Sequence, residues 1–258
     1  MKNKTVSKDF AMQHCVDVIE QIRRADYKGD RKTLQILGRK LVSVSTDQAI
    51  TARILYWRGF AFWRSAINGF NDSTIPAEIE SDIQSAIAEF DAAIQEDDMF
   101  LDAKISAAAC RGLLVYLNHV GMSSQKDLLM QAQQLLKMVK DVSPDHPRLL
   151  WVMGPIYWNA PLDRGGGADV CIEMYKRGLE IIRTMEVTSR NDLEPTWGEA
   201  ELLMSLAWSY LNHPTSNLES AELYAKTALD IVPYWHYVRD ILLPQIYEAK
   251  NKFSSTSS

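Results

Sequence analysis

Apolar residues recur every three to four positions along nearly the whole chain, which is the period of an amphipathic α-helix. No stretch has the strict apolar–polar alternation bounded by turns that is typical of a strand. The periodic segments predict helices at 6–28, 30–44, 47–68, 75–96, 99–118, 124–140, 146–158, 168–186, 195–212, 217–231 and 234–251. The pattern therefore indicates an all-α protein with short connections.

Local signals mark several helix starts. Pro76 and Pro147 suit first-turn positions, where the missing N–H costs nothing. Thr196–Glu199 and Ser216–Glu219 have the spacing of a capping box, in which a hydroxyl and a carboxylate each satisfy a free backbone N–H. These signals predict starts near residues 75, 146, 196 and 217.

Four stretches can be laid over one another as helical hairpins. The best copy carries Ala200, Leu203, Leu206, Ala207 and Tyr210 on its first helix, Ala221, Ala225, Ala228 and Leu229 on its second, and then Pro233. A second copy carries Ala52, Leu55, Gly59 and Phe62, followed by Ala86, Phe90, Ala93 and Ile94. Small residues recur where the two helices of a pair would touch.

This pattern resembles the tetratricopeptide repeat (TPR), whose period is about 34 residues. The resemblance covers residues 47–235, with hairpin connections longer than the family's tight turn. It implies a right-handed superhelix, an α-solenoid, of about four to five helical hairpins plus a C-terminal capping helix. We expect a single domain over 1–258, with a degenerate N-terminal hairpin at 5–46, a repeat core at 47–233, a capping helix at 234–251 and a disordered tail at 252–258.

Composition narrows the classes of partner. The formal net charge is −5 and no cluster of Lys and Arg appears, which argues against nucleic-acid binding. No apolar run reaches the ~20 residues of a membrane span, so we expect no integral membrane segment.

Cys15, Cys110 and Cys171 are widely separated within apolar helical patterns, which favours buried thiols in a reducing compartment. With no signal peptide visible, the sequence predicts a cytoplasmic protein, or a periplasmic or exported one if a leader preceded this numbering.

The sequence shows no catalytic constellation. The five histidines form no i, i+4 pair, and neither a His-Glu-x-x-His nor a Gly-x-Ser-x-Gly motif occurs. The run Glu96-Asp97-Asp98 is interpreted as a solvated helix end rather than a metal site. We therefore expect no enzyme activity, no metal and no cofactor.

The resemblance also assigns a concave surface. In the TPR family the first helix of each pair lines it, and the equivalent positions imply a binding surface made of Arg53, Tyr56, Phe60, Trp63, Arg64, Tyr116, Arg148, Trp151, Trp158 and Trp208. Aromatic side chains at such positions favour an apolar or extended peptide client, and the arginines suit a bidentate contact to a carboxylate. The alternative is that the same aromatic residues form the core.

The segment 158–169 contains three consecutive glycines, Gly165, Gly166 and Gly167, leading into a helix. It lacks the Gly-Lys-Ser/Thr of a phosphate loop and is interpreted as a permissive turn that packs closely on a neighbouring helix. This loop is also loosely similar to that of bacterial exported TPR-like proteins, such as the T component of TRAP transporters. That resemblance implies a trimeric binding protein for a hydrophobic small molecule.

Three hypotheses follow from the sequence. The first is a non-catalytic scaffold or adaptor that holds a protein or peptide segment in an aromatic-lined concave groove. The second is a ligand-binding component for a hydrophobic small molecule, and the third is a structural oligomer with the aromatic residues at its interface. The sequence predicts neither the identity of the client nor the oligomeric state.

Overall fold

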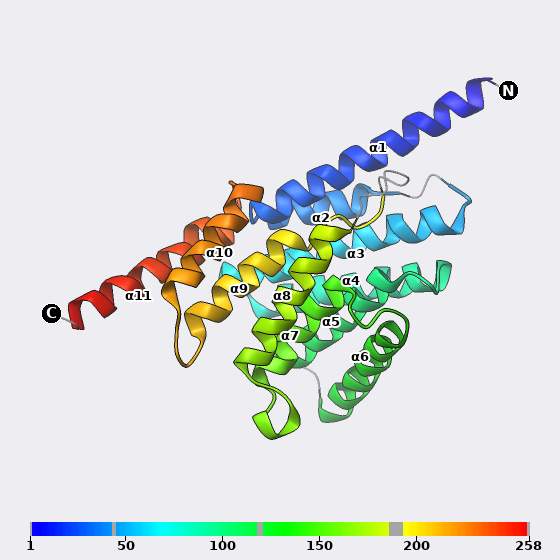
Figure 1. Ribbon diagram of the computed structural model, residues 1–258. Coiled ribbons are helices and arrows are strands. Elements are labelled where there is room, and N and C mark those ends of the chain that lie inside the picture. The colour runs from blue at the N-terminus through cyan, green and yellow to red at the C-terminus, as the bar shows by residue number, and fades with distance from the viewer. Residues whose placement is uncertain (1, 43–44, 118–120, 186–192, 257–258) are drawn as a thin grey trace. The chain divides into compact units, whose positions relative to one another are not determined.

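The computed structural model describes residues 2–42, 45–117, 121–185 and 193–256, and these residues form helices and connections without any strand (Figure 1). The helices are α1 (Lys2–Tyr27), α2 (Arg31–Lys40), α3 (Gln48–Asn71), α4 (Pro76–Glu96), α5 (Leu101–Leu117), α6 (Met122–Val142), α7 (Pro147–Asn159), the short η1 (Leu162–Arg164), α8 (Ala168–Thr184), α9 (Glu199–Asn212), α10 (Leu218–Ile231), the π-helical η2 (Tyr237–Leu242) and α11 (Leu243–Thr256). The predicted all-α class is confirmed.

Most predicted boundaries lie close to the observed ones. Pro76 and Pro147 occupy the first turns of α4 and α7, as predicted. The two capping boxes were predicted at the wrong residues. At α9 the N-cap is Gly198, whose N–H donates to Glu201 at 2.8 Å, and at α10 it is Asn217, whose side chain accepts from the N–H of Ser220.

The predicted capping helix at 234–251 is not a regular α-helix throughout. Its first part is the π-helical η2, and the N–H of Leu243 donates to the carbonyl of Val238, five residues earlier. Pro244 follows at once and has no N–H to donate, which removes one bond of the regular ladder. The predicted tail at 252–258 is helical as far as Thr256.

The helices group into two compact units. The first contains the described residues of 1–141 together with 193–195, and the second contains 142–185 and 196–256. Within each unit, helices pack mainly against their neighbours in sequence. The prediction of a single solenoid domain stays a prediction.

In the first unit, α3 packs against α2 and α4 and also contacts α1 and α5. Gly59 allows a close approach of α4 to α3, because a Cβ placed there would lie 2.9 Å from the ring of Phe90. The core around it is aromatic, and ring contacts join Tyr56, Trp57, Phe60, Trp63, Phe90 and Phe100. This small-to-large packing between α3 and α4 agrees with the repeat pattern in the sequence.

In the second unit, α8 packs against α7 and α9, and α10 packs against α9, η2 and α11. The inward face of α10 consists of small residues, since Ala221, Ala225 and Ala228 are fully buried. Gly178 on α8 similarly admits the side chain of Leu202 from α9. Small residues therefore lie at the helix contacts that the repeat pattern predicts.

The glycine-rich connection between α7 and α8 is a tight turn. Gly165 and Gly167 have positive φ angles of 74° and 113°, a region that favours glycine. A Cβ on Gly166 would lie 2.3 Å from the carbonyl oxygen of Ala160, where α7 ends. The interpretation as a permissive, closely packed turn is confirmed.

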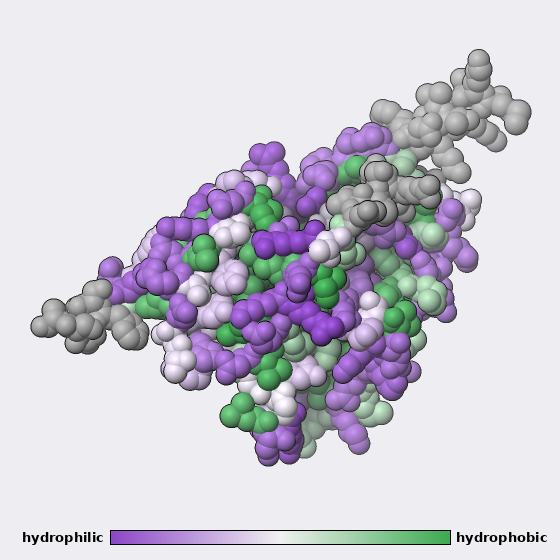
Figure 2. All heavy atoms as spheres, viewed as in Figure 1, coloured by the Kyte–Doolittle hydropathy of each residue, from purple (hydrophilic) through white to green (hydrophobic). Residues whose placement is uncertain are grey.

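All three cysteines are buried free thiols, as predicted. No helix among the described residues combines the length and apolarity that crossing a bilayer requires. On the face seen in Figure 2, hydrophobic residues lie interspersed among hydrophilic ones.

Candidate binding surfaces

Three of the predicted groove residues form the core of the first unit. Tyr56, Phe60 and Trp63 on α3 are at most 1% exposed. Tyr56 contacts the rings of both Phe90 and Phe100, so neighbouring segments cover the face that the family pattern assigns to a client. The side chains of Tyr56, Phe60 and Trp63 therefore belong to the core, which is the alternative that the sequence left open.

Two of the predicted arginines are also buried and bind groups of their own chain. Arg64 donates from Nε to Oδ2 of Asp26 at 2.8 Å, and Arg148 donates from Nε to the carbonyl of Trp197 at 2.8 Å. Arg148 also lies over the Trp197 ring, 5.2 Å from its centroid. Both guanidinium groups are buried, so the predicted contact to a carboxylate of a client is not available at these positions.

Tyr116 lies at the end of α5 and is 77% exposed. Its ring makes an edge contact with Phe70, the centroids being 6.1 Å apart. The other predicted residues of the first unit lie on α3, and all of them except Arg53 are buried.

Trp151 stands between the core and the surface of the second unit. Its indole N–H donates to the hydroxyl of Ser205 at 2.9 Å, and its ring meets Trp197 edge-on at 5.4 Å. The indole therefore joins α7 to α9 through its hydrogen bond, and it joins α7 to the connection before α9 through its ring contact. We assign it a role in positioning these two helices.

Trp158 and Trp208 are the two predicted residues that the structure both brings together and leaves accessible. They come from α7 and α9, their ring centroids are 5.0 Å apart, and their planes meet at 63°. Trp208 is 37% exposed, and Trp158 is partly exposed. Aromatic pairs prefer edge-to-face packing of this kind, and the exposed parts of both side chains are accessible to an apolar partner.

The two helix ends beside this pair are held by side-chain amides. Asn159 donates to the carbonyl of Pro155 at 2.8 Å, and Asn212 donates to the carbonyl of Trp208 at 2.9 Å. Each amide donates to the carbonyl four residues earlier, in the last turns of its own helix. The backbone under the tryptophan pair is thereby held in place.

A second surface lies on α3 around Arg53, a predicted site residue that is partly exposed. Its Nε donates to Oε1 of Glu194 at 2.9 Å, and its Nη1 donates to Asp97. The guanidinium also lies 4.2 Å above the Phe100 ring. Arg53 therefore binds carboxylates of its own chain, whereas the sequence predicted a contact to a carboxylate of a client.

Next to Arg53, the indole N–H of Trp57 donates to the carbonyl of Leu193 at 2.7 Å. Leu193 is 1% exposed, although it lies in a connection rather than in a helix. The short segment Leu193–Glu194–Pro195 is thus bound to α3 through a backbone carbonyl and a carboxylate, and its leucine side chain is buried. Sequence reasoning missed Trp57 and this segment, because no local pattern links positions 136 to 141 residues apart.

The charge on Arg53 is secured by these partners. Burial on its own would lower the pKa of the guanidinium, but hydrogen bonds to Asp97 and Glu194, and the charges of these groups, more than offset that effect. The pKa of Arg53 is therefore raised above its usual value.

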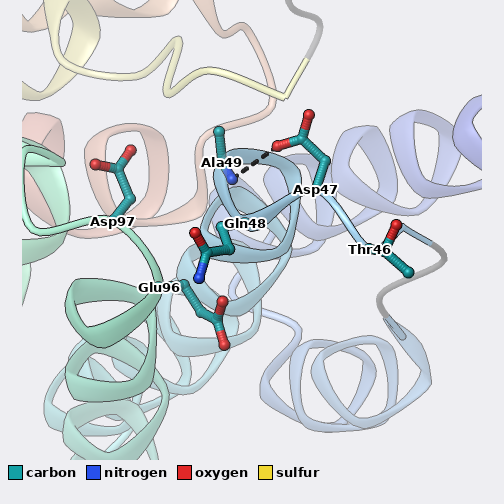
Figure 3. A pocket seen from close by; sticks show the side chains of 6 residues that line it. All are labelled: Thr46, Asp47, Gln48, Ala49, Glu96 and Asp97. Atoms are coloured by element: carbon teal, nitrogen blue, oxygen red, sulfur yellow. Dashed lines mark hydrogen bonds between the residues drawn. The ribbon is translucent and has the colours of Figure 1, made fainter.

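A pocket of about 600 Å³ adjoins this region and is lined by Thr46, Asp47, Gln48, Ala49, Glu96 and Asp97, from the start of α3 and the end of α4 (Figure 3). Asp47 caps α3 by accepting from the N–H of Ala49 at 2.9 Å. Asp97 accepts from Arg53 and from the N–H of Met99. Asp97 is therefore a capping and ion-paired residue, and the interpretation of Glu96-Asp97-Asp98 as simply solvated is corrected at this position.

The thiols have no features of nucleophiles. Burial raises the pKa of Cys15, Cys110 and Cys171, most strongly for Cys110. A raised pKa keeps a thiol protonated, whereas a nucleophile needs the thiolate.

No protein-family model matches the chain, and no curated protein has a similar sequence. The candidate surfaces therefore depend on their geometry and on the repeat pattern.

Proposed function

We propose that this protein is a non-catalytic scaffold or adaptor of the TPR-like type, and that its hairpins belong to a right-handed α-solenoid. The order of contacts from α1 to α5 and from α7 to α11 supports this architecture, since successive helices pack together there and alternate helices also touch, as α7 and α9 do. Small residues at the helix contacts support it as well.

The single observation that carries the proposal is the accessible Trp158–Trp208 pair. Tryptophan offers a large contact area at low entropy cost and dominates many interfaces. The two rings lie on adjacent helices, so that a client segment crossing α7 and α9 would contact both. We propose that the pair holds an apolar or aromatic side chain of an extended protein segment.

Two variants of the second unit test this proposal. A peptide selected from a random library for binding to the wild-type protein would be compared on Trp208→Ala and on Leu223→Ala by fluorescence anisotropy. Leu223 is the matched control, because it is an exposed apolar residue of the same unit on a different helix, α10. Loss of a central aromatic anchor costs roughly 2 kcal/mol or more, so Trp208→Ala should weaken binding by about 30-fold and Leu223→Ala by less than about 3-fold.

The proposal fails if circular dichroism shows Trp208→Ala to be folded and the selected peptides still bind it as they bind the wild type. Native mass spectrometry of the same preparations separates the alternatives. A retained small molecule lost only from Trp208→Ala would favour the hydrophobic-ligand hypothesis, and oligomers lost only from that variant would favour the structural one.

A further inference from the structure

The segment Leu193–Glu194–Pro195 lies on α3 in the manner of a bound peptide. It belongs to the connection between α8 and α9, yet it groups with the helices of the first unit. Three different kinds of contact hold it: an indole N–H to a backbone carbonyl, a guanidinium to a carboxylate, and burial of a leucine. We call the surface formed by Arg53 and Trp57 the α3 seat.

We propose that the α3 seat is a peptide-recognition site whose client is an extended acidic segment with a large apolar residue followed directly by Glu or Asp. In the structure described here, the chain's own Leu193–Glu194 occupies the seat. The protein is thereby autoinhibited at this site. This inference goes beyond the proposed function, because the α3 seat shares no residue with the Trp158–Trp208 pair.

The chemistry of the seat defines the client. The indole N–H of Trp57 donates to a main-chain carbonyl, which any residue supplies. This contact therefore positions the backbone of the segment and does not select its sequence. Arg53 binds a carboxylate, and its planar guanidinium makes that contact directional. The buried leucine requires an apolar side chain just before the acidic residue.

Neighbouring groups other than Glu194 also position the guanidinium of Arg53. Asp97 binds the guanidinium from the end of α4, the carbonyl of Ala49 lies 3.5 Å from Nη1, and the Phe100 ring lies beneath it. These contacts do not depend on Glu194. The guanidinium would therefore keep its position when Glu194 leaves, and a client would meet a prearranged group.

Covalent attachment gives the internal segment an advantage over a free peptide. A tethered ligand acts at an effective concentration that reaches the millimolar range for short connections. A client must compete with this tethered segment. Substitutions of Leu193 and Glu194 that weaken its contacts should therefore make the α3 seat accessible to a client.

The experiment uses the full chain and the acetylated, amidated tetrapeptide Leu-Glu-Pro-Thr, which has the sequence of residues 193–196. Its control is the same peptide carrying Glu194→Gln. Binding is followed through the indole N–H signal of Trp57 in a two-dimensional ¹⁵N NMR spectrum. The proteins are wild type, Leu193→Ala/Glu194→Gln, and the latter with Arg53→Gln added.

Loss of a charge-assisted hydrogen bond typically corresponds to about a tenfold change or more. We expect the double variant to bind the acidic peptide at least about tenfold more tightly than the wild type does, and about tenfold more tightly than it binds the Gln peptide. Adding Arg53→Gln should abolish the preference for Glu. A folded double variant whose Trp57 signal does not respond, or responds equally to both peptides, would overturn the proposal.

Should the double variant fail to fold, Glu194→Gln is the second test. It keeps Leu193 buried and removes one of the two carboxylates on Arg53. The acidic peptide should then shift the Trp57 signal at lower concentrations than in the wild type, and an unchanged titration would contradict the α3 seat. Because Trp208→Ala plays no part here, failure of this inference leaves the Trp158–Trp208 proposal standing.

Discussion

Arg64 and Asp26 form an ion pair inside the first unit, with 2.8 Å between Nε and Oδ2 and with both side chains almost completely buried. The pair joins α3 to α1. Asn68, one turn further along α3, donates to Oδ1 of Asp26 at 3.0 Å and to its backbone carbonyl at 3.1 Å. The carboxylate thus accepts hydrogen bonds at both oxygens, as a buried charge requires.

Replacing Arg64 should therefore destabilise the protein rather than weaken client binding directly. Removing one partner of a buried ion pair leaves the other charge uncompensated and costs roughly 3–5 kcal/mol. Urea denaturation of Arg64→Ala, followed by circular dichroism, should show a loss of about this size. The control is Lys137→Ala, whose solvent-exposed pair with Asp141 should contribute less than about 1 kcal/mol. A cost of less than about 1 kcal/mol for Arg64→Ala would contradict the structural role.

The helices were predictable because their signal is local. Periodicity and the first-turn prolines depend on residues within one or two turns of each other, and the small residues of the repeat pattern marked contacts such as Gly59 on Phe90. The groove assignment was less successful on α3, where it gave Tyr56, Phe60 and Trp63 an accessible face. Between Ala52 and Ala66 this helix is apolar on nearly all of its faces, which is typical of a buried helix. This feature of the sequence could have indicated that the three aromatic side chains are buried.

The α3 seat could not have been predicted in this way. Arg53 and Glu194 are 141 positions apart, and a single acidic residue in a connection has no pattern that identifies its partner. The Trp158–Trp208 pair was within reach because both residues lie at positions assigned to the concave surface in two neighbouring copies of the repeat, although not at the same position of the copy. Concave-surface positions on adjacent repeats become neighbours when the repeats stack.

Gly59 and Gly112 provide a matched test of the packing between helices. Both lie inside helices of the first unit, in α3 and α5. A Cβ at Gly59 would lie 2.9 Å from the Phe90 ring, whereas a Cβ at Gly112 would meet no atom within 4 Å. Gly59→Ala should cost about 1–3 kcal/mol through overpacking, and Gly112→Ala should gain about 0.5–1 kcal/mol through helix propensity. Denaturation midpoints that move in the same direction would show that the close contact does not govern stability.

Glu222 should make the second unit sensitive to acid. Hydrogen bonds from Lys226 and then from Lys250, with their charges, lower the pKa of Glu222 to about 2. Because the folded pKa lies below the usual value of 4.5, the stabilisation is present above pH 4.5 and is lost as the pH falls towards 2. Glu222→Gln should therefore lower Tm at pH 6 but leave it unchanged near pH 2.

Glu219→Gln is the control for that measurement. Glu219 also binds Lys250, at 2.8 Å, but its side chain is far more exposed, and screening by solvent weakens such a pair. Its effect on Tm at pH 6 should be smaller than that of Glu222→Gln. Equal effects of the two substitutions, or an effect of Glu222→Gln that persists at pH 2, would contradict the assigned role of Glu222.

Arg111 should control how firmly α6 is attached to the first unit. It binds both oxygens of Asp91 on α4, at 2.9 and 2.8 Å, and donates from Nε to Oε1 of Gln131 on α6 at 2.9 Å. Only two residues of α6 are buried, Ala132 and Val139, so this polar contact is a large part of its attachment. Local opening of a weakly packed helix is visible as faster amide hydrogen exchange.

Arg111→Ala should therefore accelerate exchange across Met122–Val142 by about tenfold, the equivalent of one lost charge-assisted hydrogen bond, while α3 changes little. Gln131→Ala is the matched variant, since it removes the contact to α6 but keeps the Arg111–Asp91 pair. It should reproduce most of the acceleration in α6 without the cost of an unpaired charge at Asp91. Hydrogen–deuterium exchange read by mass spectrometry separates the two helices. Equal protection of α6 from exchange in wild type and Arg111→Ala would mean that the packing of Ala132 and Val139 attaches the helix without the contacts of Arg111.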